Sequence, residues 1–226
     1  MINMSVIKSA IIFFFFLAVN GILYQEKKWQ FIGLLFLSII TFRSMMLFAG
    51  LFLFEILNNY ILNKKSIKKI LNIEFLSYYF IAALPGIIFV LWRLTTKGWL
   101  QAHPESPWKE LWHIPSMVRF IKNIAVLIHR YLDFGRVFIF IFLIFSTFYM
   151  SKKLILNKSI KQLLLLGICP TLFVTIIVLS STNDFGHRYF IVSYITFILL
   201  AFLTLTKVEK FSKLLYVCHQ IHSKPL

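Results

Sequence analysis

Charged residues are scarce in this sequence. Asp, Glu, Lys and Arg together make up 14% of the 226 residues, whereas a soluble domain carries roughly a quarter. A chain with so little charge has too few polar side chains to cover a water-soluble fold. The composition therefore excludes a soluble globular domain, and the 59% of hydrophobic residues, with 26 Phe among them, indicate a protein that lies in a membrane.

Acidic residues and cysteine are scarcer still. Eight acidic residues stand against 24 Lys and Arg, which gives a formal net charge of +16. The basic residues cluster in short connections between apolar runs, which is typical of loops that orient a membrane protein and not of a nucleic-acid interface. Two cysteines, Cys169 within an apolar run and Cys218 near the end, are too few for a disulfide framework.

Motifs of soluble enzymes and ATP-driven pumps are also absent. The sequence has no Walker A motif, no G-x-S-x-G elbow and no H-E-x-x-H pair. Two DFG triplets, at 133–135 and 184–186, lack the Gly-rich loop and strand context of a kinase. Cys218, His219 and His222 do not have the spacing of a strong zinc motif, so no metal site is assigned.

Apolar runs dominate what is present. Several approach or exceed the roughly 20 residues that cross a hydrocarbon core of about 30 Å. The first follows Lys8 without a clean small-x-small cleavage site, so we interpret it as an uncleaved span. The sequence predicts an all-α integral membrane protein, a polytopic bundle of about seven hydrophobic helices in a single transmembrane domain, 1–226. The predicted spans are 7–24, 31–42, 45–61, 75–93, 134–150, 163–180 and 188–206.

Residues 31–61 allow two interpretations. They form either one tilted helix of about 30 residues or two short helices separated at Phe42-Arg43-Ser44. An Arg at the centre of a single lipid-facing span would cost at least about 2.5–3.5 kcal/mol, so we favour two helices. Glu55 then lies near the inner end of a span, where it is either a functional intramembrane carboxylate or an interfacial residue that snorkels.

Lys-rich segments set the predicted orientation. They occupy 63–69 and 151–161 and recur in the tail, 207–226, with two spans between each segment and the next. Because Lys and Arg accumulate in cytoplasmic loops, all three are predicted to be cytoplasmic in a multi-pass protein of the cell membrane. The N-terminus, the loop 94–133 and the opening stretch 181–190 then face the extracytoplasmic side.

The outer loop 94–133 is about 40 residues long, so we expect it to have structure of its own. Ser106-Pro107-Trp108 is typical of a helix start. From Ile114 to Tyr131, apolar residues recur at helical spacing with basic residues between them. This pattern predicts an interfacial helix along the membrane surface, with a structural cap over the bundle as its simplest role.

Polar and charged residues gather on the predicted outer side. Arg presents a planar fork of donors that matches phosphate oxygens, so Arg at a lipid–water boundary favours anionic headgroups. Arg188 directly precedes a predicted span and is the strongest candidate for such a headgroup contact. The alternative is that Arg188 is an ordinary interfacial anchor. Carboxylates beside such residues can act as general bases. They can also hold a divalent cation, which is the only cofactor that the sequence suggests. The candidates for binding a lipid phosphate are Arg188, His187, Tyr189, Arg130, Arg136 and His103.

Three stretches together suggest a family. ITFRSMMLFAGLFLF (40–54) suggests paired short helices, GWLQAHPESPWKE followed by RYLDFGRVF (130–138) suggests an outer loop and the next span, and NDFGHRYF suggests a His-Arg-Tyr turn before a late span. This order resembles the C-terminal half of the GT-C class of polytopic glycosyltransferases, over most of the chain from about residue 30. The resemblance implies a bacterial enzyme that transfers a sugar from a polyprenyl-phosphate donor at the extracytoplasmic face, with Arg188 and its neighbours at the lipid phosphate.

The resemblance leaves the catalytic base unassigned. In the class a carboxylate deprotonates the acceptor while the lipid phosphate leaves, and that Asp typically lies in the first outer loop. Here the first span is followed only by QEKKWQ (25–30), which is predicted to be cytoplasmic and has no Asp. The class also has more spans, so we expect a C-terminal fragment, a truncated reading frame or a shortened relative, with doubtful activity of its own. Substitutes for the base are Glu105, Glu110, Asp133 and Asp184, and the sequence does not choose among them.

Two other functions stay open. A non-catalytic module that binds a lipid phosphate, or that pairs with another polytopic subunit, explains the basic outer loop without a base. A transporter or flippase would be expected to have repeated halves or helices broken within the membrane. Pro85-Gly86 and Cys169-Pro170 are candidate breaks, but the two halves share no pattern. In every case the expected partners include membrane lipids, and for the enzyme a polyprenyl-phosphate-linked sugar.

Overall fold

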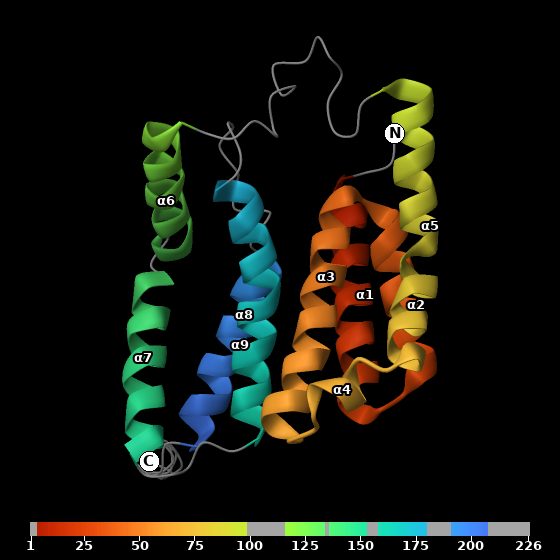
Figure 1. Cartoon of the computed structure of the whole chain (residues 1–226). Helices are drawn as coiled ribbons and strands as arrows, with labels where there is room; N and C mark the ends of the chain where they lie inside the picture. The colour runs from red at the N-terminus through yellow and green to blue at the C-terminus, as the bar shows by residue number, and fades with distance from the viewer. Residues whose placement is uncertain (1–3, 99–115, 134–135, 153–157, 180–190, 208–226) are drawn as a thin grey trace, which may run out of the picture.

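The protein is all-α wherever its structure is described. The computed structural model describes residues 4–98, 116–133, 136–152, 158–179 and 191–207, and no strand occurs among them (Figure 1). The predicted fold class is therefore confirmed at this level. The helices are α1 (Met4–Tyr24), α2 (Lys27–Ile40), α3 (Phe42–Leu57), the π-helix η1 (Asn58–Leu62), α4 (Ile67–Ile70), α5 (Ile73–Lys97), α6 (Met117–Leu132), α7 (Arg136–Lys152), α8 (Lys158–Leu179) and α9 (Ile191–Lys207).

Four stretches are long and apolar enough to cross a membrane. They are Val6–Tyr24, Ser44–Leu62, Ile73–Lys97 and Lys158–Ile176, so α1, α3 with η1, α5 and α8 carry them. Helices also lie at the three other predicted spans, but they are shorter. At a rise of 1.5 Å per residue, the 14 residues of α2 extend about 21 Å and the 17 residues of α9 about 26 Å. The count of seven spans stays a prediction.

A capped corner divides residues 31–61 into two helices, as we favoured. Thr41 has an extended backbone, with φ −157° and ψ 158°, and ends α2 before α3 begins. Its side-chain oxygen accepts a hydrogen bond from the Ser44 N–H at 3.1 Å, and the Thr41 N–H donates to Ser44 Oγ at 3.0 Å. This capping box satisfies backbone donors that a helix start leaves free. The break therefore comes one residue earlier than the predicted Phe42-Arg43-Ser44, and the side chain of Arg43 lies outside the described part.

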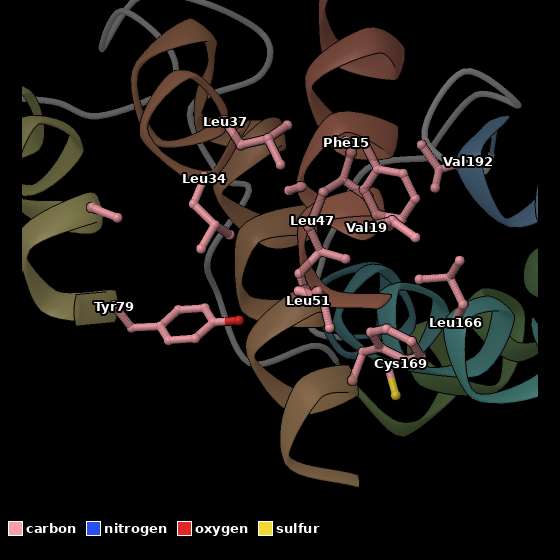
Figure 2. Close-up of a cluster of buried hydrophobic side chains, with 14 residues drawn as sticks. Phe15, Val19, Leu34, Leu37, Leu47, Leu51, Tyr79, Leu166, Cys169 and Val192 are labelled. Carbon is pink, nitrogen blue, oxygen red and sulfur yellow. The ribbon is translucent and has the colours of Figure 1, made fainter. Parts of the chain in front are cut away.

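Small residues let the helices approach closely. A Cβ on Gly33 of α2 would lie 2.6 Å from the Ala18 nitrogen of α1, and one on Gly50 of α3 would lie 2.7 Å from the Pro170 Cα of α8. Close backbone contact of this kind is the usual basis of helix packing in membranes. The resulting core runs from α1 through α3 to α8, where Phe15, Leu51 and Leu166 are among the buried side chains (Figure 2).

Connections rich in Lys meet at one end of the helical bundle. The α1–α2 turn, η1, α4, the end of α7, the start of α8 and the end of α9 all lie there in Figure 1. This arrangement agrees with one shared side for the basic segments, while the assignment of that side to the cytoplasm stays a prediction. We call this region the basic end and define it by Lys27, Lys28, Lys64, Lys65, Lys68, Lys69, Lys158 and Lys161.

The amphipathic helix expected within residues 94–133 is α6, and it packs lengthwise against the bundle. It lies beside α8, and in Figure 1 its axis follows those of α7 and α8 instead of crossing the end of the bundle. Asn123 and Leu127 are buried on the side toward α8, and the Asn123 Nδ2 donates to the Leu179 carbonyl oxygen at 3.3 Å. The sequence gives the apolar face of α6 but not the neighbour that covers it, and the expected position of this helix along the membrane surface stays a prediction.

Candidate functional site

Most residues of the predicted outer site lie outside the described part of the chain. Arg130 lies in α6, but nothing is described of its side chain. Asp133 and Arg136 are described, and they place one part of the predicted site at the junction of α6 and α7. The predicted residues outside the described ranges are His103, Glu105, Glu110, Asp184, His187, Arg188 and Tyr189.

The α6–α7 junction places an imidazole beside a carboxylate, and a cation follows three residues later in the chain. The guanidinium carbon of Arg136 lies 4.3 Å from the centre of the Tyr194 ring of α9, which is cation–π geometry. The Arg136 N–H donates to the Asp133 carbonyl oxygen at 3.2 Å, and His129 Nδ1 lies 4.0 Å from Asp133 Oδ2. A guanidinium here can attract a phosphate, and the carboxylate is a candidate general base.

An apolar groove adjoins this junction. It is open, has a volume of about 460 Å³, and lies between α6 and α8. Leu132, which lines one end of the groove, directly precedes Asp133 in the chain. The groove therefore offers an apolar surface next to charged groups, which suits a ligand with a hydrocarbon chain and a polar head. Its lining residues are Ile124, Leu127, Ile128, Leu132, Thr175 and Leu179.

A second polar site is buried near the basic end. We call it the Glu55 cluster and define it by Lys27, Gln30, Glu55, Tyr78 and Tyr79. Glu55 of α3 is 4% exposed, and its Oε2 accepts hydrogen bonds from the Gln30 Nε2 of α2 and, at 2.6 Å, from the Tyr79 hydroxyl of α5. Figure 2 shows Tyr79 reaching inward from α5. Glu55 is thus a paired carboxylate buried inside the bundle, and its depth in the membrane stays a prediction.

Lys27 connects the Glu55 cluster to the exterior. Its ammonium lies 3.7 Å from Glu55 Oε1, donates to Gln30 Oε1 at 3.3 Å, and sits 5.0 Å from the centre of the Tyr78 ring. The side chain is 59% exposed. Because Glu55 already accepts two hydrogen bonds from neutral donors, this ion pair supplements a satisfied carboxylate and does not have to neutralise a bare charge.

Further polar contacts extend from the cluster along η1 to α8. Gln162 Nε2 donates to Asn58 Oδ1 at 3.1 Å, and Lys158 Nζ donates to Asn63 Oδ1 at 2.9 Å. Asn63 also donates to Asn59 Oδ1 at 3.0 Å. A π-helix is rare and frequently marks a functional position. Here it brings amide side chains together at the basic end, where they link α3 to α8.

The sequence singled out only Glu55 of these groups. Gln30 falls in the stretch QEKKWQ, which we treated as a connection, although α2 begins at Lys27 and buries Gln30 in its first turn. No motif connects Gln30 or Tyr79 to Glu55, because they lie 25 and 24 residues away along the chain. Within the described residues, no three His, Cys, Asp or Glu side chains come together to hold a metal ion.

Comparisons with known proteins identify no relative: no family model, no curated protein and no solved structure matches this chain. The geometry of the described residues, together with the motifs of the sequence, therefore carries the functional argument alone.

Proposed function

We propose that the protein binds a polyprenyl phosphate in the membrane and acts as a glycosyltransferase-like protein of the GT-C type. The observation that carries this proposal is the apolar groove between α6 and α8, whose lining residue Leu132 directly precedes Asp133 in the chain. A polyprenyl phosphate has a long apolar chain and an anionic head, so it needs such a surface next to a cation. The resemblance of three sequence stretches to that class supplies the sugar-transfer part of the proposal.

Three residues at or next to the junction have roles in this proposal. Arg136 binds the lipid phosphate and stabilises the charge that develops on it as the sugar departs. Tyr194 holds the guanidinium in place through its ring. Among the described residues, Asp133 is the one predicted carboxylate at the junction, and it is our candidate for removing the proton of the acceptor.

A non-catalytic lipid-phosphate-binding subunit is the second candidate, and one observation favours it. The first connection, between α1 and α2, is a tight turn in which the Glu26 N–H donates to the Gly21 carbonyl oxygen at 2.9 Å. It lies at the basic end (Figure 1), opposite the end of the bundle at which α6 begins. The outer catalytic Asp that the class typically has after its first span therefore has no counterpart in this turn.

Binding of polyprenyl phosphate to the purified chain tests the shared part of both candidates. Native mass spectrometry in detergent should show saturable binding that Arg136→Ala weakens at least tenfold, equivalent to a loss of about 1.4 kcal/mol. Thr175→Trp, which fills the groove, should also weaken binding. Lys97→Ala is the matched control, because it removes a cation at the end of α5, away from the groove. Equal binding by all four proteins would contradict the site.

Sugar transfer separates the two candidates. Membranes that contain the protein should transfer a radiolabelled sugar from a polyprenyl-phosphate donor, and Asp133→Asn should abolish the transfer while leaving binding within about threefold. Binding without turnover in the wild type would favour the non-catalytic subunit. Arg188→Ala, a variant in the turn outside the described residues, tests in the same assays whether that turn belongs to the site.

A further inference from the structure

The basic end combines a large excess of lysine with few exposed carboxylates. Its eight lysines are exposed, whereas Glu26 and Glu74 are the exposed acidic residues among the described residues there, and Glu55 is buried. Lys64, Lys65, Lys68 and Lys69 fall within six residues of one connection. A surface of this charge attracts anions from solution or from a lipid layer.

Exposed apolar side chains lie among and directly after these lysines in the chain. Ile67 is 50% exposed and Ile73 is 79% exposed, and Leu71 is exposed between them. Ile70 instead points into the bundle, where it is 5% exposed and anchors α4. A surface in contact only with water gains nothing from three exposed aliphatic side chains among lysines. At the boundary of a bilayer, aliphatic side chains enter the acyl region while lysines remain among the headgroups.

Aromatic residues at the basic end also favour a position at the boundary between membrane and water. Trp29 and Tyr60 are partly exposed, and Lys28 Nζ lies 5.7 Å from the centre of the Trp29 ring. Trp and Tyr are enriched where membrane meets water, because their rings have an apolar body and a polar edge. The aromatic residues therefore place the lysines of the basic end close to lipid headgroups and not far out in solution.

The lysine-rich connection is held in one conformation by the bundle. Its Lys65 N–H donates to the Asn59 carbonyl oxygen at 3.0 Å, and Asn63 accepts a hydrogen bond from Lys158 of α8. At its other end the Asn72 side chain caps α5 by accepting from the Phe75 N–H at 2.8 Å. A connection fixed at both ends loses less conformational entropy when it binds a ligand than a free loop does.

We propose that the segment 63–73 binds the headgroups of anionic phospholipids in the leaflet at the basic end. Lys65, Lys68 and Lys69 contact the phosphates, and the aliphatic side chains of Ile67 and Ile73 enter the adjacent acyl region. The charge excess, the exposed aliphatic residues and the fixed backbone all point to a lipid surface. The site is at the opposite end of the bundle from the end at which α6 begins, and it does not depend on the proposed sugar transfer.

Lipid retention by the full chain tests this proposal. The purified protein in detergent is incubated with phosphatidylglycerol or with phosphatidylcholine, and bound lipids are counted by native mass spectrometry. We expect wild type to bind phosphatidylglycerol preferentially, and the triple variant Lys65→Gln, Lys68→Gln, Lys69→Gln to bind it at least about tenfold more weakly. The matched control is Lys8→Gln, Lys97→Gln, Lys122→Gln, which removes the same charge from elsewhere in the chain.

Two further measurements complete the test. Ile73→Gln, which leaves every lysine in place, should weaken phosphatidylglycerol binding, whereas free glycerol phosphate in excess should not displace the lipid. Unchanged helical circular dichroism and elution volume establish that each variant is folded. Equal losses in the two triple variants would overturn the proposal in favour of net charge alone. Equal retention of both lipids, or displacement by glycerol phosphate, would overturn it as well.

Discussion

The Glu55 cluster shows how single residues make a buried charge tolerable in this fold. Glu55 lies in one of the four stretches that can cross a membrane, where an unpaired carboxylate would be costly. Gln30, Tyr79 and Lys27 supply donors from two other helices, so the carboxylate holds α2, α3 and α5 together. The pattern of the sequence could identify Glu55 as unusual, but its partners depend on how three helices pack.

The Tyr79 hydroxyl should contribute measurably to stability. Tyr79→Phe keeps the ring, whose centre lies 5.0 Å from that of Phe52, and removes the hydroxyl that donates to Glu55 and accepts from Gln30 Nε2 at 3.4 Å. We expect the free energy of unfolding to fall by about 1–3 kcal/mol, because a buried charged acceptor loses a partner. Tyr78→Phe is the control: its hydroxyl donates to the Lys27 carbonyl oxygen at 2.7 Å in an exposed position, so the loss should stay below about 1 kcal/mol. Unfolding in mixed detergent with rising dodecyl sulfate measures both, and equal losses would contradict the role of Glu55.

Elements meet in this protein through small residues as much as through large apolar ones. The contact between α3 and α8 joins the helices before the outer loop to those after it, and Gly50 lies at its closest approach. The α2–α3 corner is fixed by Thr41 and Ser44, and it sets the direction in which α3 runs. The sequence predicted the corner from the cost of Arg43 within a span, but a glycine in an apolar helix does not by itself reveal its neighbour.

Adding one methyl group at Gly50 should therefore weaken the bundle. A Cβ there would lie 2.7 Å from Pro170 Cα and 3.0 Å from Pro170 N, both backbone atoms that cannot move aside. We expect Gly50→Ala to cost about 1–3 kcal/mol of unfolding free energy. In Gly167→Ala the new Cβ would meet the Phe197 ring at 3.0 Å, and a ring can shift, so the change should lie within about 1 kcal/mol of zero. A Gly50 variant as stable as wild type would show that α3 and α8 are not packed this closely.

At the scale of the whole molecule, the hydrophobic pattern of the sequence predicted where the helices lie. Helices occur at all seven predicted apolar runs, and the basic connections meet at one end. The pattern did not predict the groove that α6 forms with α8, because Leu127 and Thr175 are far apart in the chain and come together only by packing. The lipid-phosphate residues around Arg188 lie outside the described ranges, so their part of the site stays a prediction.

The shared basic end leads to a prediction about orientation. If the excess of lysine is cytoplasmic, a cysteine at Ser66 or at Glu26 should react with a membrane-impermeant maleimide only after the cells are permeabilised. Met117→Cys, at the 73% exposed start of α6, should react in intact cells. The background is Cys169→Ser, Cys218→Ser, which removes both native thiols. Labelling at Glu26 tests the two-helix interpretation of residues 31–61, because α2 and α3 must both cross the membrane for that turn to lie on the same side as Ser66. Labelling of Ser66→Cys in intact cells would show that the orientation is the reverse of the predicted one. The anionic lipid site would then lie in the outer leaflet.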